Sequence, residues 1–224
     1  MNNEIRIAGS LIVKDWEDLQ KYLKTDNNKN WGLAFHFFEE RVRTRYLNPI
    51  NAILDMDLNT GEGFAVVNLQ CSLIETIESF INGWIYFNDG IKGNPKGWFK
   101  RDVSSTTKEC FNTNEYIFSS FFKSHFEFNK VDGKEFYFSV RCGLLHETQT
   151  KNNWKIKKAN KEDKAYDVLG EFKLIYRENF QRDLILLIKR YKEIIINGGE
   201  FDGVPVTELR ENFIAKFNYI CKHS

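Results

Sequence analysis

The chain has 224 residues, and its 32 Lys and Arg residues nearly balance its 31 Asp and Glu residues, leaving a net charge of +1. This balance excludes a protein that a strong overall positive field draws to nucleic acid, so any polyanion must be met by local basic clusters. The length suits one domain over residues 1–224, and 20 Phe residues predict a core rich in large rings.

The sequence also bears on the cellular compartment and on metal binding. The first residues lack the basic start and apolar stretch of a signal peptide, and no uninterrupted apolar run approaches the roughly 20 residues that span a bilayer. No C-x-x-C pair and no clustered His spacing of the zinc type is present. We therefore expect a cytoplasmic protein with reduced thiols, no membrane partner, no metal site and no cofactor.

Helical periodicity dominates the chain. It predicts helices over about 15–23, 31–46, 64–84, 115–126, 133–149, 179–196 and 206–222, the second of which should stop near Asn48-Pro49. Residues 88–105 resemble a loop that exposes Trp98 and Phe99. Alternating residues near 154–157 and 172–175 predict a small β-hairpin around 154–175, in an insertion over 151–175. The predicted fold class is all-α, a helical bundle with that possible hairpin.

Three local basic clusters are candidate contacts for a polyanion, although each is also compatible with a solvated helix or loop face. They are Arg41 with Arg43 and Arg45, the run Lys155–Lys158 with Lys161 and Lys164, and Lys189-Arg190 with Lys192.

The segment from Phe136 to His146 combines a helical apolar stripe with two groups suited to phosphate chemistry. Phe136, Val140 and Leu144 recur every four residues and predict one buried face. Arg141 can hold a phosphate with two hydrogen bonds, and His146 can move a proton near pH 7. On a straight helix Arg141 and His146 lie about 140° apart around the axis and about 7.5 Å apart along it. A compact site therefore needs the helix to end near His146, or a second copy of the chain.

Gly143 lies between the two groups, where glycine costs about 1 kcal/mol relative to alanine in a helix. Such a residue indicates that another backbone or a phosphate approaches closely.

The segment EFYFSVRCGLLHETQTK, residues 135–151, resembles the R-x4-6-H signature of the HEPN superfamily, helical domains that include many bacterial defence and toxin ribonucleases. The resemblance implies an elaborated HEPN-like helical bundle and a metal-independent endoribonuclease. Arg141 and His146 would be catalytic, and the active cleft would lie between two protomers of a homodimer. RNA would be the substrate, and an antitoxin or other protein is a possible partner.

One departure from the family pattern concerns the residue after the arginine. Family members usually carry a polar residue there, often Asn, Asp or His, whereas this chain has Cys142. The departure favours an alternative, in which a non-catalytic module of the same fold binds a nucleotide, an RNA or a protein. A third interpretation is an interaction or structural protein in which Arg141 and His146 have no special role.

Glu75 and Glu78 are candidate supporting residues. Carboxylates three residues apart on a helix repel one another mildly unless a cation lies against them. We expect their helix to pack beside the motif helix, with at least one carboxylate orienting Arg141. The alternative is that both glutamates lie on a solvated face.

Overall fold

The fold is mainly helical but contains four small sheets among the residues that the structure describes. The structure is a computed structural model, and it describes residues 4–23, 27–58, 60–88, 97–100, 110–111, 114–128 and 130–224, for 110–111 the backbone only. The prediction of an all-α fold is therefore wrong, and the chain belongs to the mixed α/β class. All described strands have only two to five residues, too short to produce a clear alternating pattern.

The chain divides into two compact units, each assembled from separate stretches of sequence. The first unit consists of Met1–Asn48, Ser79–Thr113 and Lys189–Ser224, and the second of Pro49–Glu78 and Asn114–Ile188. Helices α4 (Glu62–Asn82) and α8 (Arg177–Asn197) contribute residues to both units.

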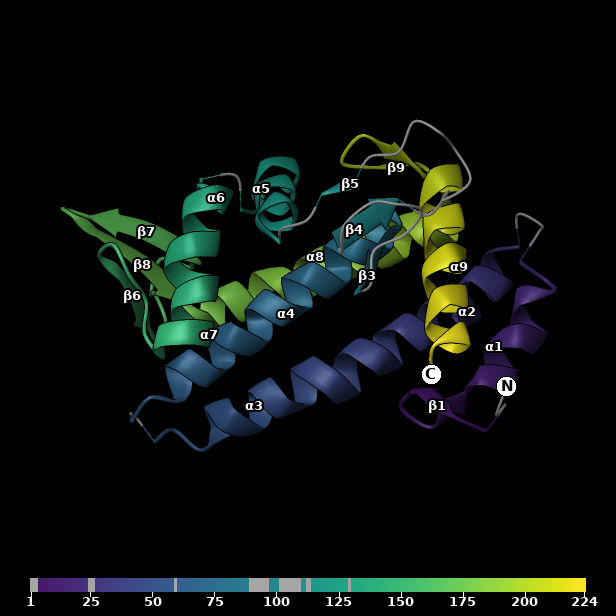
Figure 1. The fold of residues 1–224 in the computed structure, drawn as a ribbon, viewed down its shortest axis with the longest axis horizontal. Coiled ribbons are helices and arrows are strands. Elements are labelled where there is room, and N and C mark those ends of the chain that lie inside the picture. The colour runs from purple at the N-terminus through teal and green to yellow at the C-terminus, as the bar shows by residue number, and fades with distance from the viewer. Residues whose placement is uncertain are drawn as a thin grey trace. The chain divides into compact units, whose positions relative to one another are not determined.

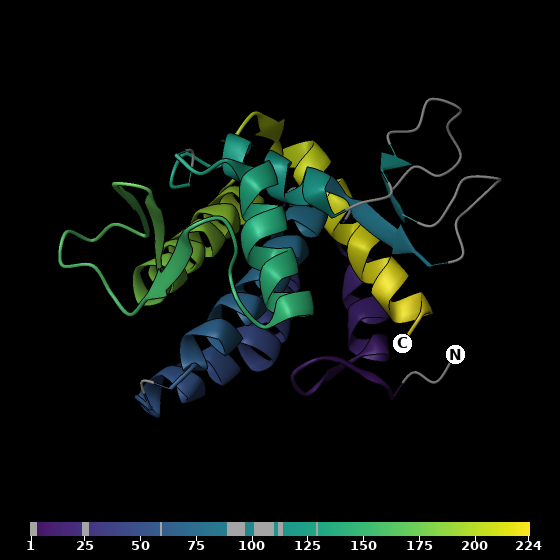
Figure 2. The same ribbon diagram turned by 60° about the vertical axis from the view of Figure 1, so that its left-hand side comes forward.

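The first unit is formed by helices from both ends of the chain and by short hairpins. Its elements are β1 (Arg6–Ala8), β2 (Leu11–Ile12), α1 (Val13–Gln20), α2 (Asn28–Val42), η1 (Arg43–Leu47), β3 (Trp84–Phe87), β4 (Gly97–Lys100), β5 (Cys110–Phe111), β9 (Glu200–Phe201), β10 (Val204–Pro205) and α9 (Val206–Lys222). Strands β3, β4 and β5 form an antiparallel sheet, and α9 lies beside it (Figure 2).

The core of the first unit confirms the expected wealth of large rings. Phe38 lies 4.8 Å from Phe80, ring centroid to ring centroid, and Phe213 contacts both rings. Other fully buried rings of this core are those of Trp16, Phe35, Phe217 and Tyr191. Aromatic pairs at such separations add about 0.5–1.5 kcal/mol beyond the area that they bury.

The predicted stop of a helix at Pro49 is wrong. Helix α2 continues through the π-helical turn η1 into α3 (Asn48–Asp55) without a break. In the wide turn the N–H of Asn48 donates to the carbonyl of Arg43, five residues back. Local π geometry redistributes the backbone hydrogen bonds next to a proline, so the missing N–H of Pro49 is accommodated.

The loop predicted for 88–105 is also partly wrong. Residues 97–100 form β4, where Trp98 and Phe99 are 7% and 1% exposed and therefore buried. The ring of Trp98 packs on that of Tyr86 and the ring of Phe99 on that of Phe87, contacts with β3 that the local sequence does not reveal. Residues 89–96 and 101–109 lie outside the described part of the chain.

The second unit holds the motif helix. Its elements besides α3 and the major parts of α4 and α8 are α5 (Glu115–Ser124), α6 (Gly133–Phe136), η2 (Tyr137–Arg141), α7 (Cys142–Glu147), β6 (Trp154–Lys157), β7 (Tyr166–Leu169) and β8 (Phe172–Tyr176). In Figure 1, α6 and α7 lie beside the sheet of β6, β7 and β8.

That sheet corrects the predicted hairpin over 154–175. The two alternating segments, β6 and β8, pair in parallel, and β7 pairs with β8 in the antiparallel sense. The result is a three-stranded mixed sheet in the order β6-β8-β7. The hairpin is formed by β7 and β8 instead, because the left-handed Gly170, at φ +60°, permits a tight turn between them.

Candidate active site around Arg141

The motif helix begins at residue 133, as predicted. The carboxylate of Asp132 accepts a hydrogen bond of 3.0 Å from the backbone N–H of Glu135, which caps the helix. A Cβ atom on Gly133 would collide with the backbone carbonyl of Phe118 in α5. Asp132 and Gly133 thus set where the helix starts and how closely it packs on α5.

A π-helical turn, η2, occupies the middle of the motif helix and ends at Arg141. The predicted buried stripe is confirmed, because Phe136, Val140 and Leu144 are at most 8% exposed. Single π turns inside α-helices are frequent at functional sites, since they redirect the side chains that follow. Arg141 is the last residue of this turn, and His146 lies on α7, which follows it.

Gly143 is explained by a close backbone approach. A Cβ atom there would lie 2.5 Å from the carbonyl oxygen of Gln149, where the chain folds back after the helix. The helix ends at Glu147, and Thr148 adopts the left-handed conformation with φ 57°. The prediction that Gly143 marks a close approach is therefore confirmed, and the approaching group is backbone.

Glu75 of α4 holds the Arg141 side chain. The Nε of Arg141 donates to Oε1 of Glu75 over 3.2 Å, and the same oxygen accepts 3.0 Å from the amide of Asn114. Both members of the ion pair are about one-fifth exposed, at 21% and 20%. The expected contact between Arg141 and a glutamate of the neighbouring helix is therefore present. Glu75 binds only the Nε of the Arg141 guanidinium. The two terminal amino groups of Arg141 form no hydrogen bond with any described residue.

The electrostatics of the pair reflect partial burial. Burial raises the pKa of Glu75, and the opposing effects of Arg141 and Asn114 only partly offset it. Burial, the largest single influence, acts to lower the pKa of Arg141, but Glu75, Tyr137 and Cys142 together outweigh it and the net direction is upward. Arg141 therefore remains a cation throughout the ordinary pH range.

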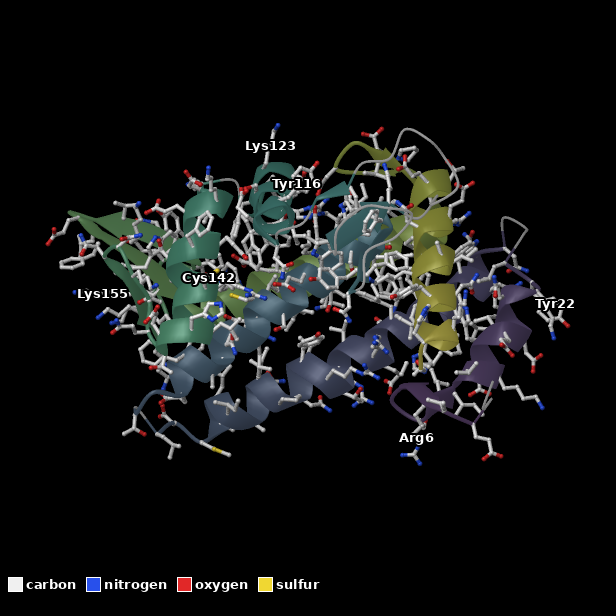
Figure 3. All side chains as sticks on the ribbon, in the orientation of Figure 1. Arg6, Tyr22, Tyr116, Lys123, Cys142 and Lys155 are labelled. Atoms are coloured by element: carbon white, nitrogen blue, oxygen red, sulfur yellow. The ribbon has the colours of Figure 1, made fainter. Side chains whose placement is uncertain are left out.

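Tyr137 and Cys142 complete the surroundings of Arg141. The guanidinium carbon of Arg141 lies 5.8 Å from the centroid of the Tyr137 ring. Burial, together with a hydrogen bond to Cys142, raises the pKa of Tyr137 to about 12, so the phenol stays protonated at neutral pH. Cys142 is half-buried on the motif helix, at the position labelled in Figure 3.

Glu78 does not contact Arg141 and takes a different place from the one proposed. Its carboxylate accepts 2.6 Å from the hydroxyl of Ser120 and lies 3.2 Å from Nε2 of His125. The side chains of Glu78 and His125 are each only 1% exposed. No sequence pattern signals this pair, because 47 residues separate the two positions.

His146 is exposed on the last turn of α7. Its ring forms no hydrogen bond or ion pair with the rest of the described chain, and it does not contact Arg141. One copy of the chain therefore leaves the two candidate catalytic residues separate.

Two general features concern metals and membranes. Within the described ranges, no group of three or more His, Cys, Asp and Glu side chains could hold a metal ion. Helix α4 is long and apolar enough to cross a membrane by length and composition alone, a criterion that core helices also meet, and 61% of its most apolar window is buried.

Comparisons with protein-family models, curated proteins and solved structures find no match to this chain. The likeness to the HEPN superfamily therefore rests on the motif segment alone.

Proposed function

We propose that this protein is a metal-independent endoribonuclease of the HEPN type, whose site is completed by a second copy of the chain. The observation that carries the proposal is that the Arg141 side chain is held at one end and open at the other. Glu75 fixes the guanidinium through Nε, while the two terminal amino groups are left without a partner among the described residues. A guanidinium held in this way is ready to bind two oxygens of a phosphate.

The separation of Arg141 and His146 supports the need for two copies. Residues five apart on an ideal α-helix lie about 140° apart around its axis, so a single straight helix does not direct both at the same phosphate. In a two-fold dimer, each patch meets its own counterpart, and the Arg141 of one copy can approach the His146 of the other.

Exposed apolar side chains on the motif helix provide the contact surface for such a dimer. Phe138 and Leu145 are each 50% exposed, and they lie on either side of Arg141 along the helix. Large apolar side chains that stay exposed on one element are candidate contacts for a protein interface.

The proposed reaction needs only side chains and the substrate. The ribose 2'-OH attacks the adjacent phosphorus, the bond from phosphorus to the 5'-oxygen of the next nucleotide breaks, and a 2',3'-cyclic phosphate forms. His146 moves the proton to or from the attacking or leaving oxygen, and Arg141 stabilises the negative charge that grows on the phosphoryl oxygens. General acid-base help of this kind contributes about 10² to 10⁴ in rate.

The test is cleavage of total RNA by the purified full-length protein in the presence of a chelator. We expect cleavage by the unaltered protein, no cleavage by Arg141→Ala or His146→Ala, and unchanged cleavage by the matched control His223→Ala. His223 is also exposed, on the C-terminal end of α9. A requirement for magnesium, or full activity of both site variants, would refute the proposal.

A non-catalytic module that binds RNA, a nucleotide or a protein is the second candidate. It is favoured by Cys142 at the position after the arginine, and by the lack of any described carboxylate or carbonyl that orients His146. The same experiment separates the two candidates. A folded protein that binds RNA without cleaving it would support the non-catalytic module.

A further inference from the structure

A basic surface hollow in the first unit is independent of the motif helix. It has a volume of about 450 Å³ and lies between the β1–β2 hairpin and the turn η1. The residues that line it include Arg6, Gly9, Ser10, Glu40, Arg43 and Arg45. Three arginines against one glutamate leave the lining with a charge of +2.

The glutamate neutralises only one of these arginines. Glu40 binds Arg43 with two hydrogen bonds, of 2.9 Å and 2.6 Å, within one turn of the helix. Neither Arg6 nor Arg45 forms an ion pair with any carboxylate that the structure describes, and both are exposed. Figure 3 shows Arg6 extending from β1 into solvent. The hollow therefore presents two cations that have no counter-charge among the described residues.

A further arginine, Arg41, lies next to Arg45 of the lining and adds to the positive charge there. Arg41 donates 2.6 Å to the backbone carbonyl of Ile7, and Arg45 approaches the same oxygen at 3.5 Å. Burial and the neighbouring Arg45 lower the pKa of Arg41 to about 10, which leaves it protonated at neutral pH. Two like charges directed at one carbonyl oxygen repel each other, and a bound anion would relieve that repulsion.

The backbone fixes this arrangement. The register of the β1–β2 pair shifts between Arg6 and Ala8, and the carbonyl that meets Arg41 belongs to the residue between them. Gly9 turns the hairpin with φ +57°, and a Cβ atom there would lie 2.7 Å from Oε2 of Glu40. The π turn η1 contributes both Arg43 and Arg45 to the lining of the hollow.

We propose that this hollow is a phosphate-binding site, in which Arg6 and Arg45 grip phosphate oxygens. Guanidinium groups match phosphate oxygens through paired hydrogen bonds, and a neutral or cationic ligand would leave the positive charge uncompensated. The phosphate belongs either to a nucleic-acid backbone or to a small free phosphate compound. The proposal does not depend on catalysis, because it concerns binding alone.

The experiment measures the affinity of the full-length protein for two probes, pyrophosphate and a 12-nucleotide 2'-O-methyl RNA. The second probe has no free 2'-OH, so ribonuclease activity cannot destroy it. The test variant is Arg6→Ala/Arg45→Ala. The matched control is Lys123→Ala/Lys134→Ala, which removes the same charge from two exposed positions of the second unit.

We expect the test variant to bind at least one probe about tenfold or more weakly, whereas the control stays within about twofold of the unaltered protein. Weaker binding of the oligonucleotide, with or without weaker binding of pyrophosphate, assigns the site to a nucleic-acid backbone, and weaker binding of pyrophosphate alone assigns it to a small phosphate compound. For the oligonucleotide, the slope of the salt dependence should also fall by about 0.7 for each phosphate that the variant no longer neutralises.

A conservative variant separates an effect on binding from an effect on folding. Arg45→Lys keeps the charge but not the planar fork, so it should bind with intermediate affinity while its thermal unfolding matches that of the unaltered protein. Equal affinity of the test variant and the control for both probes would overturn the proposal. Absence of binding by the unaltered protein at millimolar pyrophosphate and micromolar oligonucleotide would overturn it as well.

Discussion

The Nε of Arg141 lies 3.2 Å from Oε1 of Glu75, although 66 residues separate the two positions. If this contact aims the guanidinium at a phosphate, Glu75→Gln should lower RNA cleavage by about tenfold or more. It should change the free energy of unfolding by only about 1 kcal/mol, because the pair is partly solvated. Cleavage kinetics and urea denaturation measure the two effects. Unaltered cleavage would show that Arg141 does not need this carboxylate.

Glu75 should also affect how the free energy of unfolding depends on pH. Burial raises the pKa of Glu75 in the folded protein, so the native state holds this proton more readily than the unfolded chain. Its contribution to stability is therefore present at low pH and is lost as the pH rises above about 4.3, the ordinary carboxyl value. Urea denaturation from pH 4 upward should show a smaller decline for Glu75→Gln than for the unaltered protein.

Glu78 should behave in the opposite way to Glu75. Its carboxylate is buried against His125 and Ser120, so Glu78→Ala should lower the free energy of unfolding by about 3 kcal/mol. Cleavage per folded molecule should not change, because Glu78 does not contact Arg141. A fully stable Glu78→Ala protein with reduced cleavage would reverse the assignment of the two glutamates.

Two of the helical glycines, Gly32 and Gly143, should respond differently to alanine. Gly32 has only Ile196 Cδ1 near its missing Cβ, at 3.9 Å, so Gly32→Ala should stabilise the protein by about 0.5–1 kcal/mol. At Gly143 the added atom would meet the carbonyl of Gln149 at 2.5 Å, so Gly143→Ala should destabilise by about 2 kcal/mol. Thermal unfolding of both variants tests the contrast. Similar shifts would argue against the close turn after the motif helix.

The exposed side chains of the motif helix should control assembly. Phe138→Ser/Leu145→Ser should halve the mass measured by light scattering at micromolar concentration and remove cleavage, although Arg141 and His146 remain. Leu169→Ser is the matched control, because Leu169 is also exposed, at 67%, but lies on β7. A monomeric unaltered protein that still cleaves RNA would contradict the two-copy site.

Lys216 should couple folding to pH at the alkaline side. Its ammonium donates 2.8 Å to the carbonyl of Trp84, and burial lowers its pKa to about 7, with a contribution from Arg41. The unfolded chain keeps this proton up to about pH 10.4, so the stability of the protein should rise between pH 7 and that value. Lys216→Met should flatten the rise in urea denaturation at pH 7, 8 and 9. An identical slope in the variant would show that Lys216 keeps its proton when folded.

Local sequence patterns determined several helices and the placement of the motif. The four-residue recurrence of Phe136, Val140 and Leu144 predicts the buried face, and Asp132-Gly133 predicts where that helix starts. The last helix has the bounds that its apolar periodicity predicts, 206–222. These features depend on contacts within a few residues, which a repeating apolar pattern and a capping residue encode directly.

Only the tertiary structure decided the partners of the charged residues and the order of the strands. Glu75 and Glu78 are both helical carboxylates three residues apart, yet one meets Arg141 and the other meets His125. The parallel pairing of β6 with β8 likewise follows from packing. Such choices depend on which segments, distant in the sequence, meet when the apolar faces are buried. A one-dimensional pattern carries the periodicity of each face but not the identity of what covers it.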